Sequence, residues 1–224
     1  MLKAVLAKEA VKFVRSGMVV GLGSGTTARE FIKALAEVKL DDVVLVPTSA
    51  DSEVLTHEVG LGDKLRPMWA LDRIDLAVDG ADEVARDKML LKGRGGALLR
   101  EKIVAYAAER FVVLVEEQKL VEKIPARNPV PMEVVPWAWR FVARQIEEKY
   151  GGVARLRLDG GKVGPVVTDN GNYIIDWVPP GPVDPSIEDE LKIIPGVFFE
   201  SGIFAKRRDA VVLVARPDGS VTQL

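Results

Sequence analysis

The feature that most constrains the fold is an alternation, in the first half of the chain, of short apolar segments with segments of helical periodicity. Four apolar, β-branched segments are expected to be strands: residues 18–22, 43–46, 74–78 and 111–115. Helices are expected at residues 2–15, from Thr27 onward, at 52–59 and at 97–109, the last with Leu99, Ile103, Tyr106 and Ala107 facing inward. Strands that are apolar on both faces need helices on both sides of their sheet. The alternation therefore predicts an α/β fold with a doubly wound, mostly parallel, Rossmann-like sheet.

The second half of the chain has a different pattern, because strands follow one another there without helices between them. Four prolines between residues 124 and 136 mark the change. The expected elements are strands at 133–135, 154–158, 166–168, 173–178 and 197–200, a hairpin turn at 169–172, and helices at 137–150 and 185–194. Trp137 and Trp139 are candidates for a subunit interface, but we favour core positions for both. This order is close to that of a ferredoxin-like α+β domain.

A last β-branched segment, residues 210–215, is expected to return to the first sheet. We therefore expect an α/β catalytic domain formed by residues 1–126 plus 201–224. The smaller α+β domain is expected at residues 127–200.

Composition excludes several kinds of chemistry. The chain has no cysteine and one histidine, His57, so thiolate zinc sites, cysteine nucleophiles and multi-histidine metal sites are excluded. The formal net charge of −2 argues against nucleic acid as a partner. No apolar run approaches the roughly 18 residues of a membrane span, and the first residues lack a signal-peptide core. The expected protein is cytoplasmic, with no membrane partner.

Polar residues gather where four predicted strands end, at residues 23–27, 47–51, 79–83 and 116–119. Ligands of open α/β sheets bind beyond the carboxyl ends of the strands, so we expect the four clusters to share one edge. The first such cluster, residues 23–27, combines glycines with hydroxyl side chains before a helix, as an anion-binding turn does. Thr27 and Glu30 have the spacing of a capping box. The same segment also fits the dinucleotide fingerprint GxGxxA, but the next strand is followed by Pro47, Thr48 and Ser49 instead of an acidic residue. Hydroxyls in that position favour a phosphate or a sugar.

Two further clusters carry charge. Asp79, Asp82 and Glu83 follow a buried strand, where carboxylates are costly unless they face a cavity, a cation or solvent. We expect Glu83 to be solvated, and Asp79 and Asp82 to contact sugar hydroxyls or assist ring opening. The third cluster, residues 92–102, has three glycines before a helix. On spacing alone, Glu101 between two basic residues is expected to be a surface charge.

Taken together, these segments resemble one family. The sequences GLGSGTTA (21–28), DGADEV (79–84) and KGRGGALLREK (92–102) are similar to those of ribose-5-phosphate isomerase of the A type. VTDNGN (167–172) and IPGVFFESGIFA (194–205) resemble later parts of the same family. The resemblance covers nearly the whole chain in the right order.

The resemblance implies a function and a set of site residues. Glu101 would be the catalytic proton acceptor, which replaces the surface-charge interpretation, and Asp79, Asp82 and Lys92 would be the other catalytic residues. The implied substrate-binding residues are Ser24, Gly25, Thr26, Thr27, Asp79, Gly80, Ala81, Asp82, Lys92, Gly93, Arg94, Gly95, Lys119 and Lys3. The family commonly has glycine where this chain has Arg94, so that side chain is expected to point away from the ligand or to add a phosphate contact.

The implied reaction is the interconversion of D-ribose 5-phosphate and D-ribulose 5-phosphate in the non-oxidative pentose phosphate pathway. It would proceed through an enediolate, with Glu101 moving the proton and with no metal or cofactor. The resemblance also implies a homodimer or a dimer of dimers. The alternatives are an amino-sugar-phosphate isomerase/deaminase or a CoA transferase on a similar scaffold, a non-catalytic sugar-phosphate sensor and, last, a nicotinamide-dependent dehydrogenase.

Overall fold

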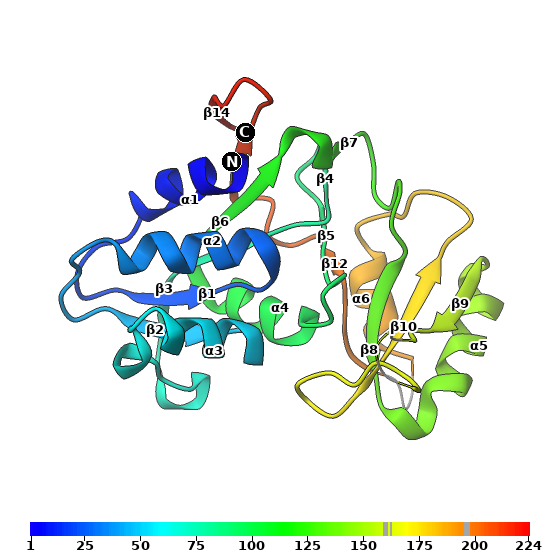
Figure 1. The fold of residues 1–224 in the computed structure, drawn as a ribbon. Coiled ribbons are helices and arrows are strands. Elements are labelled where there is room, and N and C mark those ends of the chain that lie inside the picture. Colours follow the sequence, from blue (N-terminus) through cyan, green and yellow to red (C-terminus); the bar gives the residue numbers. More distant parts are fainter. Residues whose placement is uncertain (159–160, 162, 195–197) are drawn as a thin grey trace. The chain divides into compact units, whose positions relative to one another are not determined.

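The computed structural model describes residues 1–158, 161, 163–194 and 198–224, which form two compact units (Figure 1). The large-sheet unit comprises Met1–Ala81, Arg100–Lys119 and Asp209–Leu224. The small-sheet unit comprises Asp82–Leu99 and Leu120–Arg208. Residues 82–99, 120–126 and 201–208, which the sequence analysis assigned to the larger domain, thus belong to the small-sheet unit.

The large-sheet unit contains a six-stranded sheet. Its strand order is β14 (Val221–Gln223), β13 (Val211–Ala215), β6 (Ala108–Glu116), β3 (Ile74–Gly80), β1 (Val19–Leu22) and β2 (Val44–Pro47). All neighbours are parallel except β14, which pairs antiparallel with β13 at one edge. The predicted doubly wound, mostly parallel sheet is confirmed, including the return of the last predicted strand beside β6.

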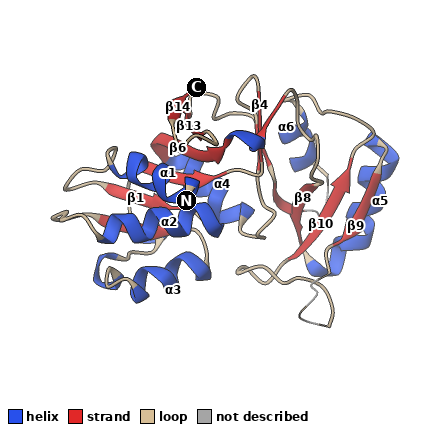
Figure 2. Cartoon of the chain, turned by 45° about the horizontal axis from the view of Figure 1, so that its top comes forward, coloured by secondary structure: helices blue, strands red, loops and turns tan. Residues whose placement is uncertain are grey.

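Helices cover both faces of this sheet, as the apolar strands require (Figure 2). The large-sheet unit has α1 (Leu2–Val11), α2 (Gly25–Ala36), α3 (Ala50–Glu58) and α4 (Leu98–Ala107) from Arg100 onward. One core cluster joins α1, α2 and α3 to alternate strand residues such as Val20 and Leu22. Gly21 points to the opposite face, where a Cβ would lie 2.2 Å from Val104 of α4. This close approach presses α4 against β1.

The tight contact also explains an error in the prediction for α4. Ile103 is 45% exposed and Ala107 is exposed, although both were expected to face inward. The buried residues of α4 are instead Leu98, Glu101, Lys102, Val104 and Ala105. The helix thus turns Val104, and not Ile103, toward Gly21, so its buried face differs from the one that hydrophobicity alone selects.

The small-sheet unit contains the ferredoxin-like arrangement that was predicted. Its four-stranded sheet has the order β11 (Phe198–Ser201), β8 (Val130–Val134), β10 (Tyr173–Val178) and β9 (Val153–Leu156), with antiparallel neighbours throughout. With α5 (Trp139–Tyr150) and α6 (Ile187–Lys192) the chain order is β-α-β-β-α-β. Met132, Ile175 and Trp177 lie on the face that packs in one core cluster with α5 and α6.

A third sheet was not predicted. It has the order β12 (Ile203–Phe204), β5 (Leu90–Leu91), β4 (Glu83–Ala85) and β7 (Leu120–Val121), and it also belongs to the small-sheet unit. Strands of two or three residues are too short to show an alternating pattern. Four 3₁₀ turns complete the described elements: Gly62–Lys64, Met68–Ala70, Glu117–Lys119 and Pro136–Ala138.

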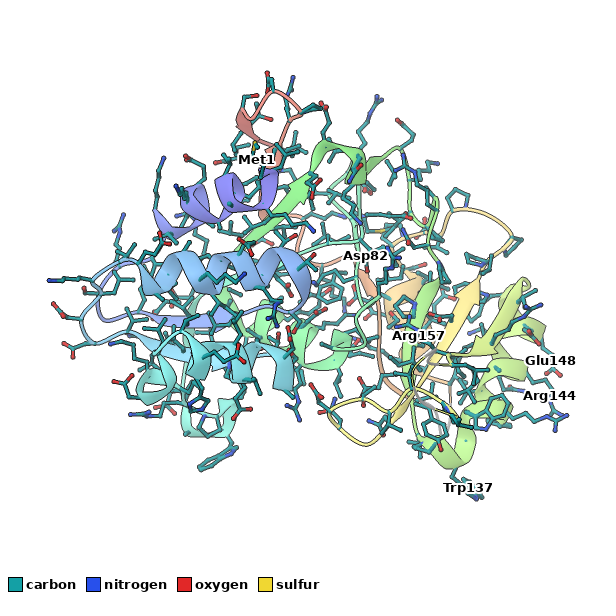
Figure 3. The ribbon with its side chains drawn as sticks, viewed as in Figure 1. Met1, Asp82, Trp137, Arg144, Glu148 and Arg157 are labelled. Atoms are coloured by element: carbon teal, nitrogen blue, oxygen red, sulfur yellow. The ribbon has the colours of Figure 1, made fainter. Side chains whose placement is uncertain are left out.

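Two further segments differ from the prediction. The segment 166–168 forms only an isolated antiparallel bridge, between Val167 and Tyr173, and Val197 lies outside the described residues. Trp137 is 95% exposed and projects outward at the start of α5 (Figure 3), so its assignment to the core was wrong. It lies in the 3₁₀ turn before α5, where the helical apolar face has not yet begun.

Candidate active site

The turn after β1 brings several hydrogen-bond donors together. Ser24 is the N-cap of α2 and Gly25 has φ +82°, so the helix begins before Thr27 and the predicted Thr27–Glu30 capping box is wrong. Gly25 and Thr26 are exposed and Thr27 is half-buried. Lys3 of α1 donates from Nζ to Thr26 Oγ1 at 2.8 Å. Unshared N–H groups of the first helical turn, hydroxyls and an ammonium group therefore meet at one helix start.

Asp79 fixes the backbone of this turn. It is 3% exposed, and its Oδ1 accepts hydrogen bonds from the backbone N–H groups of Ser24 at 3.1 Å and Gly80 at 2.7 Å. At Gly23 a Cβ would lie 2.1 Å from the same carboxylate oxygen. A side chain at position 23 would therefore collide with the carboxylate that holds this turn.

A chain of hydroxyl groups joins the end of β2 to the same turn. Ser24 Oγ lies 2.8 Å from Thr48 Oγ1 and donates to Ser49 Oγ at 2.7 Å. Thr48 Oγ1 donates to the carbonyl of Leu22 at 2.9 Å, and Ser49 caps α3 through a capping box with Ser52. The polar clusters after β1, β2 and β3 thus share one edge of the sheet, as expected from parallel strands.

The register of the strands places Glu101 at that edge. Ala108, just after α4, pairs with Ile74 at the amino end of β3. Val104, earlier in α4, lies against Gly21 of β1. Gly21 pairs with Ala77, which is three residues further toward the carboxyl end of β3. The helix α4 therefore runs from the carboxyl ends of the strands toward their amino ends. Glu101 is one turn before Val104, about 4.5 Å further toward the carboxyl ends. It is in the first turn of α4 and 5% exposed, so the surface-charge interpretation is wrong.

The remaining large-sheet residues lie after the same strand ends. Gly80 ends β3 and Ala81 follows it, and a Cβ on Gly80 would lie 3.6 Å from Cβ of Thr27. Lys119 ends the 3₁₀ turn Glu117–Lys119 that follows β6, and it is half-buried.

The small-sheet unit holds the other predicted residues, which are Asp82 before β4 and residues 92–95 in a loop after β5. Lys92 is 3% exposed, donates its N–H to the carbonyl of Gly202 at 2.9 Å, and has Nζ 5.6 Å from the ring centre of Phe204. Gly93 has φ +98°, which favours glycine. Asp82 Oδ2 accepts from the N–H of Arg94 at 3.0 Å. Arg94 and Gly95 are exposed, and residues 92–96 are called the glycine loop below.

Glu83 is not the solvated acid that was expected. It is 1% exposed and accepts four hydrogen bonds of 2.7–2.8 Å, from the N–H groups of Ala126, Arg127 and Asn128 and from the Asn128 side chain. Burial of a carboxylate is tolerated when so many donors surround it. Glu83 therefore shapes the 126–128 loop and is removed from the candidate chemistry.

Arg157 was not among the site residues predicted from the sequence. Its side chain donates to the carbonyls of Gly93 and Arg94 in the glycine loop. The only signal in the sequence is a basic residue at the end of a predicted strand, which is a common feature. Thr48 and Ser49, by contrast, belonged to a polar cluster that the sequence did mark.

A pocket, a metal site or a membrane-spanning helix elsewhere in the described residues could also carry a function. A pocket of about 400 Å³ in the small-sheet unit is lined by Arg86, Glu122 and Asp184 among others, and by none of the predicted site residues. Among the described residues, no group of three or more histidine, cysteine or acidic side chains is arranged to hold a metal ion. None of the helices in the described part of the chain combines the length and apolar character needed to cross a bilayer.

Comparison with known proteins gives one consistent family. The sequence model described as ribose 5-phosphate isomerase A (phosphoriboisomerase A) matches residues 44–219. The chain is 48% identical over 226 residues to ribose-5-phosphate isomerase A from Thermococcus kodakarensis, covering 97% of this chain and 95% of the relative. A solved D-ribose-5-phosphate isomerase in complex with phospho-erythronic acid is similar, with a TM-score of 0.93 and 44% identity over 100% of this chain and 97% of that one. The structure of ribose 5-phosphate isomerase A from Methanocaldococcus jannaschii is also similar, with a TM-score of 0.90 and 44% identity over 100% of this chain and 97% of that one.

Proposed function

The chain belongs to the ribose-5-phosphate isomerase A family, and from that premise we propose how its own residues interconvert D-ribose 5-phosphate and D-ribulose 5-phosphate. The reaction moves one proton between C1 and C2 of the open-chain sugar, and an enediolate lies between the two isomers. A base on one side of the enediolate plane can serve both carbons. The proposal therefore needs one carboxylate, a phosphate site and donors for the developing oxyanion.

Glu101 is the proposed proton acceptor. The observation that carries this assignment is its place in the first turn of α4, at the carboxyl edge of the sheet and 5% exposed. A buried carboxylate is weakly hydrated, which favours proton transfer to and from carbon over exchange with bulk water. Its edge of the sheet also carries the turn after β1.

The turn after β1 is the proposed phosphate site. The N-terminal N–H groups of α2, the hydroxyls of Thr26 and Thr27, and the Lys3 ammonium supply donors and positive charge. Ser24, whose proton is already directed toward Ser49, is left to accept a hydrogen bond from the substrate. Lys119 is a further proposed contact.

The glycine loop is the proposed oxyanion site, with Lys92 as its cation. The two aspartates have different surroundings, which supports different roles. Asp79 Oδ1 already binds two backbone N–H groups, so Asp79 holds the phosphate turn. Asp82 is half-buried and faces the loop through the Arg94 N–H, so we assign to it the movement of protons between the sugar oxygens or in ring opening.

We also propose a cytoplasmic enzyme that works as a homodimer or a dimer of dimers, needs no metal or organic cofactor, and acts on a small pentose phosphate. Size-exclusion chromatography with light scattering tests the assembly.

The decisive experiment is an isomerase assay of purified protein with ribose 5-phosphate in the presence of EDTA, with Glu101→Gln as the test variant. If Glu101 is the base, kcat falls by about 10²–10⁴-fold while the sugar phosphate still binds. The matched control is Glu148→Gln on α5, since that glutamate is exposed on the small-sheet unit. Ketopentose formation by Glu101→Gln at the wild-type rate would reject the assignment.

A further inference from the structure

Arg157 connects the glycine loop to the small sheet. Its Nη1 donates to the carbonyl of Gly93 at 3.1 Å and to that of Arg94 at 2.9 Å. Its Nε donates to Asp176 Oδ2 at 2.8 Å, and Nη2 donates to Asp176 Oδ1. One guanidinium group thus holds two consecutive loop carbonyls on one side and a carboxylate on the other. A lysine ammonium has no fixed fork with which to repeat this arrangement.

Arg157 is itself fixed by the sheet. Its N–H donates to the carbonyl of Ile174 at 2.8 Å, and its carbonyl accepts from Val166 at 3.0 Å. Alternation along the strands puts Ile174 and Asp176 on the face opposite Ile175 and Trp177. The glycine loop lies against that face, because a Cβ on Gly96 would approach the Ile174 side chain to 3.2 Å.

The direction of the two carbonyls determines the direction of two N–H groups. In a trans peptide the C=O and the following N–H point in opposite directions. The carbonyl of Gly93 faces Arg157, and the N–H of Arg94 accordingly faces the other way and reaches Asp82. The carbonyl of Arg94 also faces Arg157, so the N–H of Gly95 points to the side that holds the Asp82 carboxylate. Two successive N–H groups on one side of a loop favour negatively charged groups there, and the first of them already binds the Asp82 carboxylate.

We propose that Arg157, held by Asp176, is a positioning residue that sets these two peptide planes, so that the Arg94 N–H holds the Asp82 carboxylate and the Gly95 N–H is aimed at the oxyanion of the enediolate. The inference rests on the proposed function of the glycine loop. Arg157 acts through the loop backbone, with its own charge taken up by Asp176 (Figure 3 labels Arg157 and Asp82).

The test uses two variants of the full-length enzyme, Arg157→Lys and Asp176→Asn. Arg157→Lys keeps the positive charge but loses the planar guanidinium group with its several fixed donors. Asp176→Asn keeps the side-chain shape but loses the ion pair with Arg157. Misplaced oxyanion donors are expected to lower kcat about 10²-fold in Arg157→Lys and about 10-fold in Asp176→Asn, with the KM for ribose 5-phosphate within about 3-fold of wild type. Binding of phospho-erythronic acid, whose planar carboxylate resembles the enediolate, should weaken by similar factors. Binding of inorganic phosphate should not change.

The matched control is Arg144→Lys, in the exposed Arg144–Glu148 pair of α5, where the Nε–Oε1 distance is 3.4 Å. It should keep the wild-type kcat and KM. Folded Arg157→Lys or Asp176→Asn with kcat and phospho-erythronic acid affinity within 2-fold of wild type would overturn the proposal. If Arg157→Lys fails to fold, Asp176→Asn decides by the same criteria. A wild-type protein without isomerase activity would instead refute the proposed function, and phospho-erythronic acid binding would still report on the loop.

Discussion

Replacement of Gly23 by alanine tests whether the carboxylate of Asp79 organises the turn after β1. The added methyl carbon would lie 2.1 Å from Asp79 Oδ1 and 2.2 Å from its Cγ. The backbone at Asp79 cannot move easily, because β3 is paired with a strand on each side, and the Asp79 side chain has little free space since it is 3% exposed. The collision is therefore expected to displace the Asp79 side chain.

The magnitude follows from two contributions. Overpacking a rigid site costs about 1–3 kcal/mol. Displacing the carboxylate also disrupts its hydrogen bonds with the N–H groups of Ser24 and Gly80, and hydrogen bonds to charged groups contribute about 1.5–3 kcal/mol. We expect Gly23→Ala to lower the free energy of unfolding by about 3–5 kcal/mol. For a chain of this size that corresponds to a fall in Tm of about 10 °C.

Thermal unfolding followed by circular dichroism measures the effect, and steady-state kinetics measure its consequence for the phosphate site. The KM for ribose 5-phosphate should rise, because the N-terminal N–H groups of α2 lose their alignment. The control is Gly181→Ala, where a Cβ meets nothing within 4 Å and the Tm should stay within about 2 °C of wild type. A Gly23→Ala protein as stable as that control would refute the reasoning about Asp79.

Three further substitutions address separate contacts. Glu83→Gln should lower the free energy of unfolding by about 2–4 kcal/mol, because the NH₂ group of glutamine would face backbone N–H donors that now bind a carboxylate oxygen. Urea denaturation measures this change, and an unchanged midpoint would contradict it. Lys3→Met should raise the KM for ribose 5-phosphate about 10-fold and make it less sensitive to salt, with little change in kcat, and an unaltered KM would remove Lys3 from the phosphate site. Changing Thr26 and Thr27 to valine should likewise raise KM in steady-state assays more than it lowers kcat, and the opposite pattern would place these hydroxyls in the chemical step.

Much of the large sheet could be predicted because its strands are buried on both faces. The segments that became β1, β3 and β6 are nearly continuous apolar runs, and such runs carry a strong signal. The sheet formed by β4, β5, β7 and β12 carries almost none, since its strands have two or three residues and depend on long-range pairing.

The candidate site also contains residues with a clear sequence signal and residues with almost none. Glu101 stands between Arg100 and Lys102, a pattern typical of an exposed helix face, yet Glu101 and Lys102 are both buried. The family motif, and not the local spacing, identified it. Arg157 could not be found in either way, because its partners in the glycine loop are more than 60 residues earlier in the chain.

The path of the chain between the two units limits how this enzyme can be altered. The chain passes from one unit to the other after Ala81, Leu99, Lys119 and Arg208. The first two passages fall inside the DGADEV and KGRGGALLREK segments, and the third directly follows Lys119. No single cut therefore separates a catalytic fragment from an accessory one. A shorter active enzyme therefore cannot be made by removing residues from either end of the chain. Circular permutation should be attempted at loops far from these three positions, such as the turn between β13 and β14.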